Sequence, residues 1–113
     1  MNNKFKKFVV HCKKSEYDVY IGRPGKWGNP FMIDEDHSRD DVIQMYKEWL
    51  NGEREISLIT AKSMSNGFYL KPPTIEEIQK ELKGKILGCW CSPRKCHGDI
   101  LAEIANSNDL IKY

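Results

Sequence analysis

Side chains capable of chemistry concentrate in two short segments of the chain, residues 21–31 and residues 88–99. The first segment combines a guanidinium, an ammonium, an indole and a carboxamide, which belong to Arg23, Lys26, Trp27 and Asn29. Arginine can hold a phosphate through two parallel hydrogen bonds, an indole can stack on a base, and a carboxamide can bind a polar edge or fix the loop backbone. This mixture favours a nucleotide-like ligand, although Trp27 and Phe31 could equally be core aromatics beneath a turn.

The second segment leads from a predicted strand through a short loop, residues 92–95, into a predicted helix that begins near residues 96–99. Such a loop presents backbone N–H groups and the positive end of the helix dipole to an anion. Arg94 and Lys95 could add point charges, and Gly98 would let a ligand approach closely. The alternative is that these are solvated surface charges beside an ordinary helix cap.

Two further side chains of the second segment would contact the same ligand. His97 would donate a hydrogen bond to it, and Asp99 would either cap the helix or accept from a sugar hydroxyl. The complete set of predicted ligand-binding residues is Arg23, Lys26, Trp27, Asn29, Cys91, Arg94, Lys95, Cys96, His97 and Asp99.

The thiols of the second segment allow two other kinds of site. The pattern C-x-C-x4-C-H supplies four potential zinc ligands, namely Cys89, Cys91, Cys96 and His97. Neighbours in a first helical turn point about 100° apart, so Cys96 and His97 are an awkward pair for a tetrahedral site, and we favour neither a metal nor a cofactor. Alternatively, Cys96 beside Lys95 and His97 at a helix N-terminus would have a lowered pKa and act as a nucleophile, or it would be a buried thiol that behaves as a small hydrophobe.

The composition is that of one ordinary globular domain, residues 1–113. With 40% apolar and 30% charged residues, the chain can bury a single core. Its net charge of +2 is too small for an extended nucleic-acid track, so nucleic acid is allowed but not favoured as a partner, and self-association is left open. No secretory signal or membrane-spanning stretch is visible, so we expect a cytoplasmic protein with reduced cysteines and no membrane partner.

Hydrophobic periodicity predicts three strands and three helices. The strands are residues 8–12, 18–22 and 86–91, and the helices are residues 38–51, 74–83 and 96–105. Two of the helices begin with the spacing of a capping box, Ser38 with Asp41 and Thr74 with Glu77. We therefore expect an α/β fold: a single small domain with a mixed sheet of three to four strands packed by about three helices.

Three features of this fold are less firmly specified by the pattern. Only five residues separate the first two strands, too few for a crossover, so these strands are expected to be antiparallel if they pair directly. Residues 110–113 would add an edge strand. The mixed periodicity of residues 53–73 leaves their form open, with a lid as one interpretation.

The two segments together carry a specific resemblance. It rests on residues 18–23, 26–31 and 84–91, followed by Pro93, Cys96, His97, Gly98, Asp99 and Leu101. These residues resemble domain-of-unknown-function family 4326, whose members occur in bacteria and bacteriophages. The resemblance covers residues 9–106, within which residues 53–73 are atypically long, and it implies that both segments are loops that converge on one pocket.

We therefore expect a small, phage-type domain that binds a phosphate-bearing nucleotide or a nucleotide-derived signal, with sequestration of that signal from host defence as its role in the host cytosol. Arg23 and the turn at residues 96–99 would hold the same phosphate, the turn through its backbone N–H groups. Two alternatives stay open: an enzyme that acts on a nucleotide derivative through Cys, His or Asp chemistry, and a zinc-stabilised interaction or nucleic-acid-binding module.

Overall fold

The structure is a computed structural model, and it describes residues 8–23, 25–56, 71–92 and 94–107. In chain order its elements are β1 (Val9–His11), β2 (Val19–Tyr20), α1 (Arg39–Leu50), α3 (Ile75–Leu82), β3 (Leu87–Cys89) and α4 (His97–Ala105). The expected edge strand at residues 110–113 and most of the segment at residues 53–73 lie outside the described residues. The α/β class is confirmed, and the residues that the structure describes form three strands and three helices of one small domain.

The sheet has the order β1-β3-β2, and both of its pairings are parallel. All three residues of β3 are buried, as befits a central parallel strand covered on both faces. The sheet is therefore parallel where a mixed sheet was expected. Because β3 lies between β1 and β2, these two strands do not pair directly, so the antiparallel arrangement expected for a direct pairing does not arise.

The short link between β1 and β2 is sufficient because the strands themselves are short. They contain three and two residues, so the link has to run back over only two residues of β3, roughly 7 Å, while it crosses two strand spacings, roughly 10 Å. Asp18 anchors the start of β2, where its backbone N–H donates to the carbonyl of Ile86 at 2.7 Å and its carboxylate accepts from the N–H of Ile86 at 2.8 Å. This double contact fixes β2 against β3.

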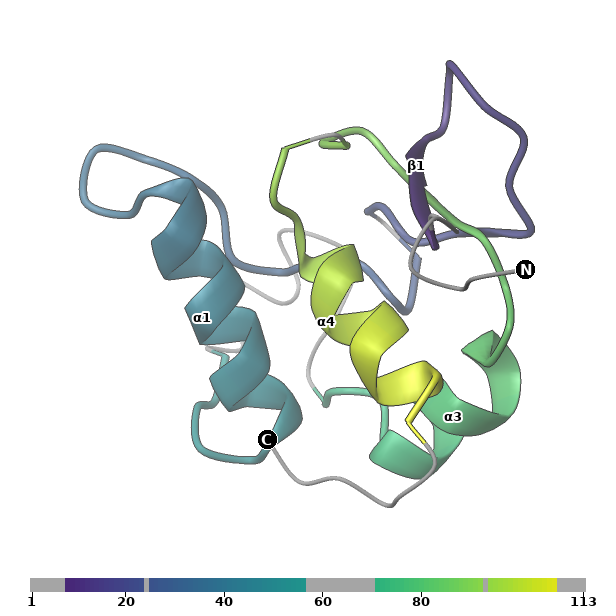
Figure 1. Cartoon of the computed structure of the whole chain (residues 1–113). Coiled ribbons are helices and arrows are strands. Elements are labelled where there is room, and N and C mark those ends of the chain that lie inside the picture. The colour runs from purple at the N-terminus through teal and green to yellow at the C-terminus, as the bar shows by residue number, and fades with distance from the viewer. Residues whose placement is uncertain (1–7, 24, 57–70, 93, 108–113) are drawn as a thin grey trace.

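Each helix begins at a side-chain cap. Ser38 and Thr74 accept from the backbone N–H three residues ahead, in the two capping boxes that the sequence predicts. Figure 1 shows α4 between α1 and α3, and α4 also packs against β1 and β3. The fully buried core residues come from the three helices, from β3 and from the residue after β2: Ile21, Tyr46, Ile78, Leu87, Leu101, Ile104 and Ala105. In the described ranges no helix combines the length and the apolar character that crossing a membrane requires.

Candidate functional site

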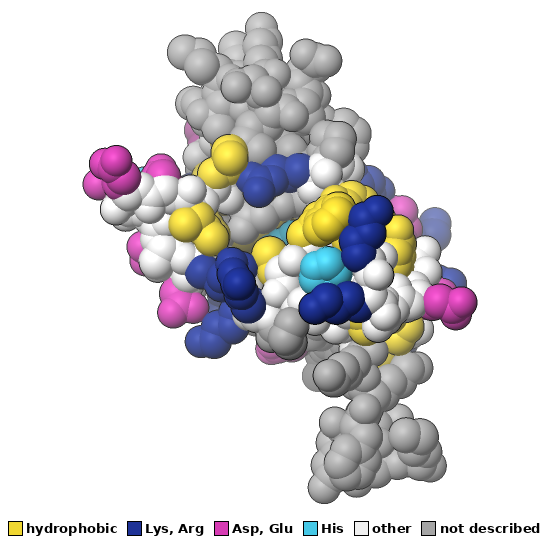
Figure 2. Space-filling view, turned by 90° about the horizontal axis from the view of Figure 1, so that it is seen from above, with side chains coloured by type: hydrophobic (Ala, Val, Ile, Leu, Met, Phe, Trp, Pro, Cys, Tyr) yellow, Lys and Arg dark blue, Asp and Glu magenta, His cyan; other side chains and the backbone are white. Residues whose placement is uncertain are grey.

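A cavity of about 350 Å³ lies where β2 and β3 end. The lining includes Gly22, two residues after β2, and Trp90, directly after β3, and side chains of α1 complete the wall. Figure 2 shows the hollow in the surface, with basic and apolar side chains around it. Ligands of open parallel sheets bind at this carboxyl edge, because loops and helix starts converge there. Both segments singled out by the sequence contribute lining residues.

The rim of the cavity is basic. Arg23, Arg39 and Lys95 line it from three separate parts of the fold, and among the described lining residues there is no Asp or Glu. The guanidinium of Arg39 donates to the backbone carbonyl of Lys95 at 3.2 Å, which ties α1 to the loop before α4. Lys95 lies 3.7 Å from the carboxylate of Asp40, but both side chains are about three-quarters exposed, so water screens this pair. The arrangement suits an anion.

His97 lines the cavity and is held in one neutral form. Its Nε2 lies 2.8 Å from the carbonyl oxygen of Ile21, and because a carbonyl only accepts, Nε2 carries the proton. Burial lowers the pKa of His97 to about 4, and the positive charge of Arg23 contributes in the same direction. The imidazole is therefore uncharged at neutral pH. Its donor atom is already used within the protein, which leaves Nδ1 as an acceptor.

Two thiols lie beside His97 and also line the cavity. The sulfur atoms of Cys89 and Cys96 are 3.3 Å apart, and Cys96 Sγ lies 3.9 Å from His97 Nδ1. The hydrogen bond from Cys96 lowers the pKa of Cys89 to about 6, whereas the same bond, together with burial, raises the pKa of Cys96. The pair therefore holds one proton tightly and releases the other readily.

Of the four zinc ligands considered from the sequence, the structure brings the sulfur atoms of Cys89 and Cys96 face to face. Within the ranges that the structure describes, no group of three or more His, Cys, Asp or Glu side chains is arranged so that it could hold a metal ion. Cys89 and Cys96 face each other, but Nε2 of His97 is bonded to a backbone carbonyl and Cys91 lines the cavity separately. Metal analysis of the purified protein remains the direct test of this alternative.

The start of α4 is closed by its own side chains. Cys96 Sγ accepts from the N–H of Gly98 at 3.1 Å, and the carboxylate of Asp99 accepts from the N–H of Cys96 at 3.2 Å. The N–H of Asp99 donates to the carbonyl of Cys96 at 3.0 Å. The N–H groups of Cys96, Gly98 and Asp99, which the sequence predicts to hold a phosphate, are thus used within the cap. Of the two roles considered for Asp99, the structure shows capping.

Gly98 serves close packing within the fold. A Cβ at this position would lie 2.5 Å from the Cδ1 of Ile21 and 3.2 Å from the Cγ1 of Val9. Gly98 is itself buried and Ile21 is fully buried, so the closest contact cannot relax into open space. The glycine lets α4 approach the strand ends, which places its first turn beneath the cavity.

Replacing Gly98 by Ala is expected to destabilise the protein by about 1–3 kcal/mol, because the added methyl overpacks a closed contact. The intrinsic helix preference for Ala acts in the opposite direction but amounts to only about 1 kcal/mol. Chemical denaturation measures the difference. The matched control is Gly25→Ala, whose Cβ would meet its nearest neighbour, the carbonyl of Gly22, at an ordinary 3.4 Å. Equal stability of the Gly98 variant and the parent would contradict the packing argument.

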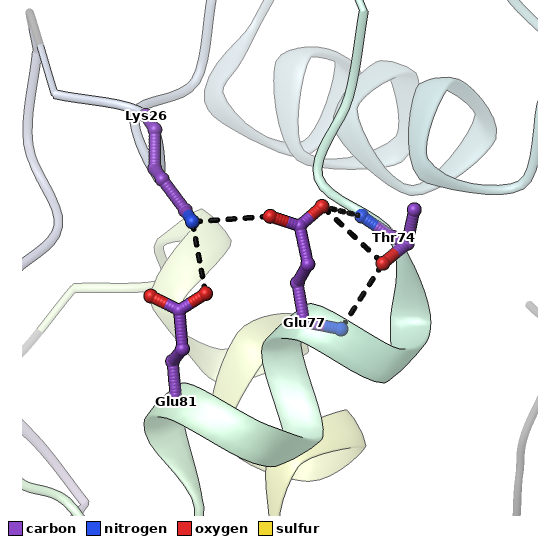
Figure 3. A network of polar contacts seen from close by, with 4 residues as sticks. All are labelled: Lys26, Thr74, Glu77 and Glu81. Carbon is purple, nitrogen blue, oxygen red and sulfur yellow. Dashed lines mark hydrogen bonds and ion pairs between the residues drawn. The ribbon is translucent and has the colours of Figure 1, made fainter.

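Three predicted binding residues of the first segment make their contacts within the protein. Lys26 does not line the cavity, and its ammonium pairs with Glu77 at 3.1 Å and Glu81 at 2.9 Å on α3 (Figure 3). Trp27 is 6% exposed and belongs to the core, which is the alternative that the sequence left open for it. Asn29 lies at the cavity wall, but its amide donates to the carbonyl of Val42 and its oxygen accepts from the N–H of Phe31, so it fixes the loop.

The remaining predicted residues divide between the cavity and its surroundings. Five of them line the cavity: Arg23, Cys91, Lys95, Cys96 and His97. The other two, Arg94 and Asp99, do not. Arg94 is exposed on the loop before α4.

Sequence reasoning missed several lining residues, among them Tyr20, Arg39 and Trp90. A signal for Trp90 was present, since strand alternation places it on the face opposite Cys89 and Cys91 and so outside the core. For Arg39 no local signal existed, because it is one of several charged residues in the first turn of an amphipathic helix.

The fold and the cavity define a small α/β domain with a basic-rimmed pocket at the carboxyl edge of a parallel sheet. The family model of the domain of unknown function DUF4326 matches residues 6–107, and the chain belongs to this family. It is 35% identical over 98 residues to an uncharacterized 12.4 kDa protein of the nrdA-td intergenic region of Enterobacteria phage T4, covering 87% of this chain and 76% of that protein. No solved structure matches the chain significantly.

Proposed function

We propose that this domain binds a phosphate-bearing nucleotide, or a signal molecule derived from one, in the cavity at the strand ends. The observation that carries this proposal is the convergence of Arg23, Arg39 and Lys95 on one cavity whose described lining contains no acidic side chain. The cavity volume, about 350 Å³, falls in the range of small-molecule sites. Arginine side chains suit a phosphate because the guanidinium can donate two parallel hydrogen bonds to it.

The biological setting that we propose is counter-defence. The relative from phage T4 supports a role during infection, when the protein would lie in the host cytosol. A small domain with one ligand site can protect the phage by sequestering a nucleotide signal of host immunity. Its capacity would then be set by its affinity and its abundance.

A second candidate function is catalysis on a nucleotide derivative. It is favoured by the Cys89–Cys96 pair, since the hydrogen bond from Cys96 lowers the pKa of Cys89 and both thiols line the same cavity as the basic residues. Denaturing the complex and analysing the released ligand separates the two candidates. Unchanged ligand supports sequestration, and a product supports catalysis.

A thermal-shift screen tests the proposed function. The probes are mononucleotides, dinucleotides, cyclic oligonucleotides and ADP-ribose derivatives. A ligand that binds only the native state adds about 2.7 kcal/mol of stability at a hundredfold excess over Kd, which gives a clear rise in Tm. The proposal fails if no phosphate-bearing compound raises the Tm of the parent protein.

Arg23→Ala is expected to weaken the binding of the compound found in this screen by about 1.5–3 kcal/mol, the free energy of a hydrogen bond to a charged group. Arg23 is exposed, so the free energy of unfolding should change little. Isothermal titration calorimetry measures the affinity. Lys80→Ala is the control, because Lys80 is an exposed cation on α3 that does not line the cavity. Parental affinity in Arg23→Ala would remove Arg23 from the site.

A further inference from the structure

Trp90 is an exposed tryptophan at the cavity, directly after β3. Its side chain is 56% exposed, whereas Trp27 and Trp49 are 6% and 1% exposed. Tryptophan is highly buried on average, so a half-open indole in a small domain calls for an explanation. Burial in the core does not provide one, because strand alternation turns Trp90 away from the side on which Cys89 packs.

The indole is nevertheless held in place. Its Nε1 donates to the hydroxyl of Tyr20 at 2.8 Å, and that hydroxyl lies 3.4 Å from the backbone carbonyl of Arg23. The ring of His11 meets the indole edge-on with a centroid distance of 5.7 Å. The ammonium of Lys13 lies 5.5 Å from its centroid. Trp90 is thus oriented in advance of binding and linked to the loop that carries Arg23.

The exposed apolar surface of the domain is concentrated around the same cavity. Four large hydrophobic side chains are exposed in the described ranges, and three of them, Met32, Ile33 and Trp90, line the cavity. Figure 2 shows apolar side chains on two sides of the hollow, beside basic ones. Apolar surface gathered at a pocket marks a place where a ligand completes the burial.

A base that carries a phosphate fits both the apolar and the basic part of this lining. An aromatic heterocycle can stack on the indole, while its attached phosphate reaches Arg23, Arg39 or Lys95 within the same cavity. A wholly apolar ligand would give the basic rim no anion to bind, and a bare phosphate would leave the indole uncovered. The combination therefore favours a base linked to a phosphate.

We propose that Trp90 is the stacking platform for the base of the ligand, with Met32 and Ile33 as the apolar wall of the same subsite. This inference rests on the proposed function and specifies how the nucleotide is recognised. Because the only N–H of the indole is bonded to Tyr20, Trp90 contacts the base through its face and reads no edge of it. Purines, which have the larger face, bind more tightly than pyrimidines, and adenine and guanine bind with similar affinity.

Titrations with AMP, GMP, UMP and ribose 5-phosphate test this subsite in the parent, Trp90→Phe and Trp90→Ala. AMP and GMP are expected to quench Trp90 fluorescence and to bind roughly tenfold or more tightly than ribose 5-phosphate. Trp90→Ala should lower the AMP affinity roughly tenfold to hundredfold and leave the ribose 5-phosphate affinity unchanged, and Trp90→Phe should keep most of the AMP affinity because it keeps an aromatic face. Thermal unfolding establishes that both variants are folded.

The outcomes separate this inference from the proposed function. If ribose 5-phosphate binds as tightly as AMP, or Trp90→Ala binds AMP like the parent, the stacking platform is wrong while phosphate binding stands. If none of the four compounds binds and no phosphate-bearing compound in the wider nucleotide screen raises the Tm, the proposed function fails and the platform fails with it. Self-association that is lost in Trp90→Ala, without any nucleotide effect, would assign this face to a second copy of the chain and overturn the inference.

Discussion

Acidification from about pH 7 to about pH 4 is expected to remove about 3 kcal/mol of stability through His97 alone. Burial holds the folded-state pKa of this imidazole at about 4, below its ordinary value of 6.5. The unfolded chain therefore takes up the proton first as the pH falls. The stability is fully present above pH 6.5, declines between pH 6.5 and about 4, and is lost below the folded-state pKa.

Urea unfolding at a series of pH values measures this contribution, with His97→Gln as the comparison. Glutamine keeps an N–H that can donate to the carbonyl of Ile21 but has no proton to gain in this range. Carboxylates with lowered pKa values, such as Asp41 at its capping box and Glu77 beside Thr74, also lose stability in acid, but they do so equally in both proteins. The slopes should therefore differ between pH 6.5 and about 4. Identical slopes would show that His97 is not buried in its neutral form.

The helices could be predicted from sequence because their signals are local. Ser38 and Thr74 supply caps three residues before acidic partners, and apolar side chains then recur at helical spacing. The arrangement of the strands could not be predicted in this way. Whether β3 pairs with β1, with β2 or with both depends on contacts between residues almost seventy or more positions apart in the chain, which periodicity does not encode.

For the candidate site, sequence reasoning located the segments better than it located the side chains. Lys26 and Arg39 illustrate why. Lys26 lies in the motif, but two carboxylates on α3 hold its ammonium there, whereas Arg39 lies outside both segments and reaches the cavity from α1. Each placement depends on how a helix packs beside the loop, so composition alone could not distinguish them.

The two tryptophans of the motifs show the same limit. Trp27 and Trp90 both stand between small or polar neighbours in loops that follow strands, and the chemistry of an indole is identical in both. The backbone carbonyl of Trp27 accepts from the buried hydroxyl of Tyr46 at 3.0 Å, which fixes that turn over the core. Trp90 instead follows the buried strand β3 and points out of it. Burial, which decides between core and ligand contact, becomes visible only in the fold.

The cap of α4 is the clearest case in which the fold changes the chemistry of a motif. The sequence predicts an anion site at this helix start, where Arg94, Lys95 and Gly98 accompany the backbone N–H groups of the first turn. In the structure the thiol of Cys96 accepts from the N–H of Gly98, and the carboxylate of Asp99 accepts from the N–H of Cys96. Phosphate recognition therefore falls to side chains that approach from other elements, and Arg23 and Arg39 become the residues on which the proposed function depends most.

Removing both guanidiniums is expected to have the largest effect on binding. If Arg23 and Arg39 hold one phosphate, each single alanine variant should weaken the identified ligand by about 1.5–3 kcal/mol. The double variant should weaken it more than either single variant, and by at least about 3 kcal/mol where the two losses add, which is more than a hundredfold in Kd. Both residues line the same cavity from different elements, so a double-mutant cycle reports whether they contact the same group.

The cycle separates a shared phosphate from two independent contacts. A coupling energy of at least about 0.5 kcal/mol, of either sign, indicates that Arg23 and Arg39 act on one group, and additive losses indicate two separate groups on the ligand. Arg39 also bonds the carbonyl of Lys95, so its variant needs a fold control, for which Arg39→Lys keeps the charge without the planar guanidinium. Weaker binding in Arg39→Lys at unchanged Tm points to bidentate recognition. Parental affinity in the double variant would place the ligand elsewhere on the protein.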